Sequence, residues 1–185
     1  MDIITIIAIA VGLAMDAFAV SITSGTTIKR LKINHALQIA AFFGAFQAFM
    51  PVIGWLAGLG LISFISGIDH WIAFGLLVFI GCKMIYESIK IESREDKSNP
   101  LNFYVLLMLS VATSIDALAV GLSFAFLKIS IATPIIIIGA VTFLLSFLGV
   151  FAGNKFGHFF ENKIEIVGGI VLIGIGLKIL VEHLV

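Results

Sequence analysis

Residues 16–21 read Asp-Ala-Phe-Ala-Val-Ser, and residues 116–121 read Asp-Ala-Leu-Ala-Val-Gly. The two segments are 100 residues apart, agree at four of six positions, and each lies within a long apolar run. A carboxylate near the centre of a membrane-spanning helix costs roughly 2.5–3.5 kcal/mol on insertion scales. A residue without a role is therefore not expected twice in the same context, and the two aspartates are the first candidates for a functional site.

Composition indicates the class of protein. Hydrophobic residues make up 61% of the 185-residue chain and charged residues only 12%, about half of what a soluble domain carries. So much apolar surface does not fit in the core of one soluble domain of this size, whereas a bilayer can receive it. Because the formal net charge is zero, no nucleic-acid partner is indicated, and the lone Cys82 can form no intramolecular disulfide.

Six apolar runs are long enough to cross a hydrocarbon core about 30 Å thick. The expected membrane-spanning helices are Ile3–Ser24, Ala36–Leu61, Trp71–Ile89, Leu101–Leu127, Ile131–Ala152 and Ile164–Leu184. We therefore predict an all-α integral membrane protein in which residues 1–185 form a single membrane domain. The first run lacks the basic segment of a signal peptide and contains Asp16, so we expect it to be a retained helix.

Basic side chains predict the orientation in the membrane. The first, third and fifth connections between these spans contain Lys29, Arg30, Lys32, Lys90, Arg94, Lys97, Lys155 and Lys163. The second connection has none, and the fourth has only Lys128. Since connections rich in Lys and Arg stay in the cytoplasm, we expect both termini outside it.

Similarity between the two halves extends beyond the aspartates. Residues 80–83, Ile-Gly-Cys-Lys, resemble residues 175–178, Ile-Gly-Leu-Lys, and the second span matches the fifth more loosely. We predict two three-helix repeats, residues 1–90 and 101–185, joined by a cytoplasmic linker at residues 91–100. Because three is odd, the second repeat enters from the opposite face, which gives an inverted repeat with a site near the midplane. The alternative is that shared helix composition imitates a repeat.

Small residues share the helix faces of the two aspartates. Positions three, four or seven residues away are Gly12, Ala19 and Thr23 around Asp16, and Ala112, Ala119 and Ser123 around Asp116. Such faces allow close helix contact and also leave room for an ion. The alternative is that both aspartates are protonated or hydrogen-bonded between helices and serve packing alone.

Two carboxylates in one cavity repel each other, so that one takes up a proton or a divalent cation relieves the repulsion. The predicted metal ligands are Asp16, Asp116, Gln47, Thr113 and Ser146, with Ser114 and Thr142 as further oxygen donors. Oxygen ligands suit magnesium, calcium or manganese. A zinc or copper site is poorly supplied, because the four histidines lie near span ends and Cys82 has no thiol partner.

Three segments resemble the small six-helix manganese efflux pumps, the MntP type of the LysE exporter superfamily. They are Met15–Ser21, Thr113–Gly121 and the Phe43-Gly…Pro51…Gly54-Trp55 segment, and the resemblance covers essentially the whole chain. It implies export of Mn²⁺ from the cytoplasm of a prokaryote, across the cell (inner) membrane, by a transporter rather than an enzyme. Mn²⁺ would be the transported substrate, with no resident cofactor, and Asp16 and Asp116 would match the intramembrane acids of the family. Gln47 occupies a place where some relatives carry an acid.

No Walker A pattern is present, so an ion gradient or the membrane potential would drive transport, and proton exchange is our hypothesis. Two alternatives stay open. An exporter of amino acids, or of another small cation, would also belong to this superfamily, but only Lys83 or Lys178 offers a group for an amino-acid carboxylate. An intramembrane aspartyl hydrolase would usually carry Gly-x-Gly-Asp, whereas Asp16 follows Ala-Met and Asp116 follows Ser-Ile.

Overall fold

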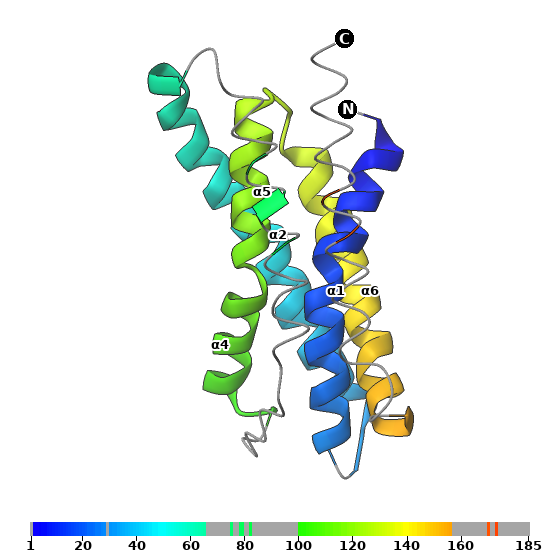
Figure 1. Cartoon of the computed structure of the whole chain (residues 1–185). Helices are drawn as coiled ribbons and strands as arrows, with labels where there is room; N and C mark the ends of the chain where they lie inside the picture. Colours follow the sequence, from blue (N-terminus) through cyan, green and yellow to red (C-terminus); the bar gives the residue numbers. More distant parts are fainter. Residues whose placement is uncertain are drawn as a thin grey trace.

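The computed structural model of the chain describes residues 2–28, 30–65 and 100–156, together with residues 75, 78, 79, 82, 170 and 173. These residues form helices and short connections, with no strand among them (Figure 1). The helices are α1 (Ile3–Thr27), α2 (Ile33–Ile65), α4 (Phe103–Thr113), α5 (Ile115–Phe126) and α6 (Ala132–Phe156).

Four stretches of the described helices are long and apolar enough to cross a membrane. They are Ile3–Thr27, Ile33–Gly60, Phe103–Phe126 and Ala132–Lys155, the third of which consists of α4 and α5 together. The prediction of an all-helical membrane protein is confirmed for these spans. The predicted third and sixth spans, Trp71–Ile89 and Ile164–Leu184, lie outside the described residues except at six helical positions.

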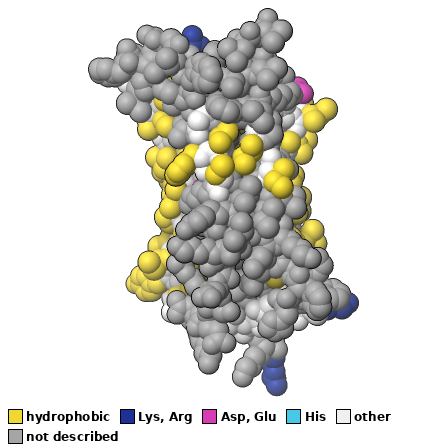
Figure 2. Space-filling view, viewed as in Figure 1, with side chains coloured by type: hydrophobic (Ala, Val, Ile, Leu, Met, Phe, Trp, Pro, Cys, Tyr) yellow, Lys and Arg dark blue, Asp and Glu magenta, His cyan; other side chains and the backbone are white. Residues whose placement is uncertain are grey.

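Large apolar side chains are exposed on the surface while several polar side chains are buried. Ile4, Phe49 and Leu144 are 77%, 59% and 59% exposed, whereas Gln47 and Ser146 are fully buried. In the face shown in Figure 2, apolar side chains surround the middle of the molecule and the coloured Lys and Arg side chains lie toward its two ends. A bilayer accounts for this pattern, because lipid solvates apolar side chains and leaves polar groups to find partners inside the protein.

Helices α1 and α6 lie side by side and run in the same direction (Figure 1). Gly149 of α6 faces Phe18 and Ser21 of α1, and a methyl group at Gly153 would collide with the carbonyl of Ile22. Small residues at such contacts let two backbones approach each other closely within a membrane. The two helices therefore form one closely packed pair.

Helices α2 and α5 form a second pair of the same kind. A side chain at Gly54 would collide with the carbonyl of Leu118, and one at Gly121 would collide with the carbonyl of Pro51. Further along both helices, Gly58 of α2 contacts Ala125 of α5, and the two helices run in the same direction (Figure 1).

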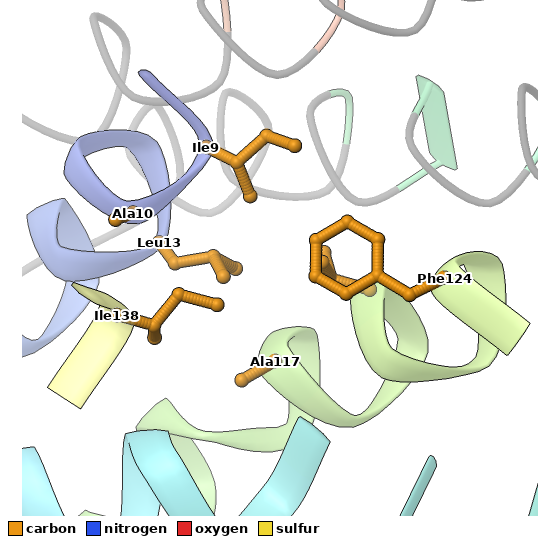
Figure 3. Close-up of a cluster of buried hydrophobic side chains, with 7 residues drawn as sticks. Ile9, Ala10, Leu13, Ala117, Phe124 and Ile138 are labelled. Carbon is orange, nitrogen blue, oxygen red and sulfur yellow. The ribbon is translucent and has the colours of Figure 1, made fainter. Parts of the chain in front are cut away.

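The two pairs meet where α2 crosses α6, with Gly44 against Gly139. Two clusters of buried apolar side chains fill the interior around them. The buried members of the first are Ile9, Ala10, Leu13, Ala117, Val120, Phe124 and Ile138 (Figure 3). Those of the second are Ala17, Ile28, Ala36, Ile39, Phe43, Leu106 and Val150.

Two side chains bond to the main chain just beyond the end of a neighbouring helix. Trp55 of α2 donates its Nε1–H to the carbonyl of Ile129, which follows α5, at 3.1 Å. Asn154 of α6 donates from Nδ2 to the carbonyl of Ile28, which follows α1, at 2.9 Å. Each bond satisfies a carbonyl for which no helical N–H is available. Each helix pair is thus tied at its end as well as along its length.

Candidate metal site

The two aspartates have different surroundings although their sequences match. Asp16 is half-buried in the middle of the continuous helix α1, whereas Asp116 is 5% exposed and is the second residue of α5. The fourth span is interrupted directly before Asp116, because α4 ends at Thr113 and α5 begins at Ile115. The single span predicted over Leu101–Leu127 is therefore two helices.

The local sequence explains this interruption. Residues 13–15 are Leu-Ala-Met, which favour a helix, whereas residues 113–115 are Thr-Ser-Ile. The hydroxyls of Ser114 and Thr113 both donate to the carbonyl of Ser110, at 2.6 and 3.3 Å. Hydroxyls that bond back to the preceding turn compete with the helical N–H groups and bend helices. The first span has no such hydroxyls at the matching positions and continues through Asp16.

The break changes the electrostatics around Asp116. At the break, the N–H of Ser114 donates to the carbonyl of Val111 and the N–H of Leu118 donates to the carbonyl of Ser114, each at 3.2 Å. The first N–H groups of α5 and the last carbonyls of α4 are the groups that helix ends leave without helical partners. Because Asp116 lies in the first turn of α5, the helix dipole favours its negative charge by about 0.3–1 kcal/mol.

Gln47 connects α2 to the helix that carries Asp16. Its Nε2 donates to the carbonyl of Leu13 at 3.0 Å, one turn before Asp16. This bond turns the amide oxygen away from Leu13, and Oε1 has no hydrogen-bond partner among the described residues. Pro51, one turn further along α2, has no N–H for the main-chain carbonyl of Gln47. A buried residue of α2 thus brings an unpartnered side-chain oxygen toward the aspartates.

Helix contacts place these groups at one level of the bundle. Leu13 of α1 and Ala117 of α5, each close in sequence to an aspartate, belong to the same buried cluster as Ile138 of α6 (Figure 3). The parallel packing of α2 on α5 puts Gln47 level with the break around Ser114. We call this level, which contains Asp16, Gln47, the α4–α5 break and Asp116, the aspartate layer.

Helix α6 adds two hydroxyls to the aspartate layer. Thr142 and Ser146 are fully buried, and neither Oγ has a partner among the described residues. Ser146 lies one turn before Gly149, which faces Phe18 of α1, so Ser146 is near the level of Asp16. Other buried hydroxyls bond back to a carbonyl of their own helix, as do those of Ser21, Ser110 and Ser123. The two α6 hydroxyls therefore have bonding capacity left for a ligand.

The structure brings all five predicted metal ligands into this layer, and their role as ligands stays a prediction. Four of them are buried, namely Gln47, Thr113, Asp116 and Ser146. The small-residue faces were predicted less well: Gly12 and Ala19 are buried, but Thr23 and Ala112 are exposed and do not line an interior site. The sequence analysis also did not predict the break between α4 and α5. The residues that could have indicated it are Thr-Ser-Ile, directly before Asp116.

Other potential sites lie away from this layer or are not formed by the described residues. Among the residues that the structure describes, no three His, Cys, Asp or Glu side chains gather as a metal cluster would require. A cavity of about 340 Å³ lies between α2 and the end of α5, lined by Trp55, Leu59, Ala125, Lys128, Ile129 and Ser130.

Comparison with known sequences assigns the chain to a family. Residues 30–180 match the sequence profile of the family described as "Putative manganese efflux pump". The chain belongs to this family. Proteins named "Putative manganese efflux pump MntP" from Crocosphaera subtropica and Methanosarcina acetivorans are 58% and 56% identical to it. Both alignments cover 100% of this chain and 98% of the relative.

A third relative of the same name, from Gloeothece citriformis, is 59% identical over 184 residues, which are 97% of its length. No solved structure matches the chain. The family resemblance inferred from the aspartate segments is thereby confirmed over nearly the full length.

Proposed function

We propose that the protein exports Mn²⁺ across the cell membrane of a prokaryote. The observation that carries this proposal is the aspartate layer, where buried oxygens without a hydrogen-bond partner among the described residues accompany two acids. The relatives of the chain carry the name "Putative manganese efflux pump MntP". The proposed ligands are Asp16, Asp116, Gln47, Thr113 and Ser146. Carboxylate, amide and hydroxyl oxygens suit Mn²⁺, and two carboxylates match its charge.

The protein then acts as a transporter rather than an enzyme, and proton exchange is the proposed source of energy. Moving two elementary charges outward against 100 mV costs roughly 4.6 kcal/mol. Exchange for two protons removes that cost, and the two aspartates carry the protons back. Proton influx that Mn²⁺ stimulates in proteoliposomes would support this coupling, whereas metal flux unaffected by a proton gradient would contradict it.

We also infer that residues 1–90 and 101–185 are inverted repeats, joined by residues 91–100. A shift of 100 positions carries α1 onto α4 and α5, and a shift of 99 carries α2 onto α6. Under this correspondence the α1–α6 pair becomes the α5–α2 pair, and the α2–α6 crossing corresponds to itself. The correspondence also relates Trp55 to Asn154, the two residues that bond beyond the ends of α5 and α1.

The two apolar clusters support the same relation. Corresponding members are Ala17 and Ala117, Val20 and Val120, Ile39 and Ile138, and Leu109 and Ile9. Inverted halves are related by an axis in the membrane plane, and transporters built this way bind their substrate where the halves meet. The aspartate layer lies beside the α2–α6 crossing, where such an axis would pass.

The proposed orientation has both termini outside the cytoplasm. Arg30 and Lys32 follow the end of α1, and Lys155 lies in the last turn of α6. Because α1 and α6 run in parallel, these three cations lie at the same end of the molecule, whereas Lys128 lies at the other. The positive-inside rule places the end with three basic residues in the cytoplasm.

Cellular metal content tests the proposed function. In a bacterial strain that lacks manganese efflux, the protein should restore growth in high Mn²⁺ and lower the manganese content of the cells. Growth in the presence of excess amino acids should stay unchanged. Rescue from amino acids alone would favour an amino-acid exporter, and an unchanged manganese content would contradict the proposal.

A further inference from the structure

One face of α6 carries two hydroxyls that lie one turn apart. Ile138, Thr142 and Ser146 are spaced four residues apart, so they share this face, and all three are fully buried. Ile138 packs in the same cluster as Leu13 of α1 and Ala117 of α5 (Figure 3). The face that carries Thr142 is therefore turned toward the interior of the bundle.

The packing of α6 on α1 gives the level of Thr142. Gly149 of α6 faces Phe18 of α1, and the two helices run in parallel. Thr142, two turns before Gly149, therefore lies within one turn of the level of Leu13. The carbonyl of Leu13 is the group that accepts the hydrogen bond from the Nε2 of Gln47.

The crossing of α2 and α6 indicates the same level. Gly139 of α6 contacts both Gly44 and Ala48 of α2. Gly139 comes three residues before Thr142, and Gln47 lies between the two α2 residues. Contacts with two different helices thus place the side chains of Thr142 and Gln47 in the aspartate layer.

The hydroxyl of Thr142 lacks the bond that a hydroxyl within a helix usually makes. Such groups bond back to a carbonyl of the preceding turn, as those of Ser21, Ser110 and Ser123 do. The Oγ1 of Thr142 has no partner in the part of the chain that the structure describes. It does not donate to the Oε1 of Gln47 either, which is buried without a partner as well. A buried hydroxyl of this kind is destabilising unless a ligand supplies the missing contact.

We propose that the hydroxyl of Thr142 is a direct ligand of the transported divalent cation, kept there at a cost to the stability of the metal-free fold. The hydroxyl and the amide oxygen of Gln47 offer neutral lone pairs in a layer that also contains two carboxylates, which is a ligand set for a cation. This inference rests on the proposed function and adds a ligand to the same site. Under the shift of 99 positions Thr142 corresponds to Phe43, so the two halves contribute unequally to the site.

Thr142→Val tests both parts of the inference, because it replaces the hydroxyl by a methyl group of similar size. The thermal midpoint of the metal-free, full-length protein in detergent should equal or exceed the wild-type value, since a buried polar group without a partner is removed. The affinity for Mn²⁺, measured by paramagnetic resonance titration, should fall by at least about 10-fold. Even groups behind the ligands of a metal site typically have an effect of this size.

Two further variants separate the hydroxyl from the rest of the side chain and from buried hydroxyls in general. Thr142→Ser keeps a hydroxyl and should retain most of the affinity for Mn²⁺. Ser21→Ala is the matched control, since it removes a fully buried hydroxyl that already bonds to the carbonyl of Ala17. It should leave the affinity unchanged and should not raise the midpoint.

Wild-type affinity in Thr142→Val would overturn the inference and leave the proposed function intact, and equal losses in Thr142→Val and Thr142→Ser would also overturn it. A metal-free midpoint below that of the wild type in Thr142→Val would contradict it too, because the hydroxyl would then be a bonded part of the fold. Failure of the proposed function looks different: the wild-type protein itself would bind no Mn²⁺ in the same titration, and both conclusions would fall.

Discussion

Asp16 and Asp116 show how identical side chains acquire different surroundings from their immediate neighbours. Asp116 lies in the first turn of a helix and is held by a local dipole, whereas Asp16 lies in mid-helix, one turn from a carbonyl that Gln47 contacts. For a cation bound between them, the position of Asp116 would be set by its own helix, whereas the position of Asp16 would depend on contacts with neighbouring helices.

If both aspartates bind the same ion, the losses of manganese tolerance caused by substituting each of them should not add. Asp16→Asn and Asp116→Asn should each abolish manganese tolerance in an efflux-deficient strain, and the double variant should be no worse, because residues that act as a unit are strongly non-additive. Growth in graded Mn²⁺, with membrane protein quantified, measures this. Two partial losses that multiply in the double variant would indicate separate sites or a packing role.

Residue types predicted much of the candidate site but not its conformation. Gln47 and Ser146 were predicted as interior oxygen donors because polar side chains are costly in a span, and both are buried. Thr23 and Ala112 were misplaced, because sharing a helix face with an aspartate does not decide how far that face is covered by other helices. The break depends on where Ser114 directs its hydroxyl, which spacing alone does not reveal.

At the scale of helices, the glycines decide which helices pack closely. The backbones of α1 and α6 approach at Gly149 and Gly153, and those of α2 and α5 at Gly54 and Gly121. The sequence predicted apolar helices of the right length, but it did not predict these pairings. They depend on contacts between segments more than 60 residues apart.

Gly153→Ala should destabilise the α1–α6 pair. The added methyl group would collide with the carbonyl of Ile22, and overpacking of this kind costs about 1–3 kcal/mol. In a chain of this size the thermal midpoint in detergent should fall by about 2–4 °C for each kcal/mol.

Gly60→Ala is the matched control, since none of the atoms that the structure describes lies within 4 Å of a methyl group there. Because alanine favours a helix over glycine by about 1 kcal/mol, this variant should be as stable as the wild type or slightly more so. Equal midpoints for the Gly153→Ala and Gly60→Ala variants would mean that α1 and α6 do not approach as described.

At the scale of the whole molecule, hydropathy predicted four spans that the structure describes, because a bilayer selects for length and apolar character. How the helices are arranged around the aspartate layer was harder to predict. The matching aspartate segments suggested two related halves, and the paired contacts of α1 with α6 and α2 with α5 support that proposal.

The proposed orientation predicts the side on which reporters appear. A reporter fused after Val185 should be outside the cytoplasm, and one inserted within Ser93–Ser98 should be inside, because the basic connections stay in the cytoplasm. Alkaline phosphatase and fluorescent-protein fusions measure the two cases. A cytoplasmic reporter at Val185 would overturn the orientation and the direction assigned to export.

Mn²⁺ flux into proteoliposomes made with the purified protein tests the central claim most directly, with a metal-sensitive dye enclosed in the vesicles. Wild-type protein should carry Mn²⁺ across the membrane faster than empty vesicles allow. The Asp16→Asn/Asp116→Asn variant, reconstituted in equal amount, should show no flux above that background. Flux that persists in the double variant, or wild-type vesicles that behave as empty ones, would contradict transport of Mn²⁺ through the aspartate layer.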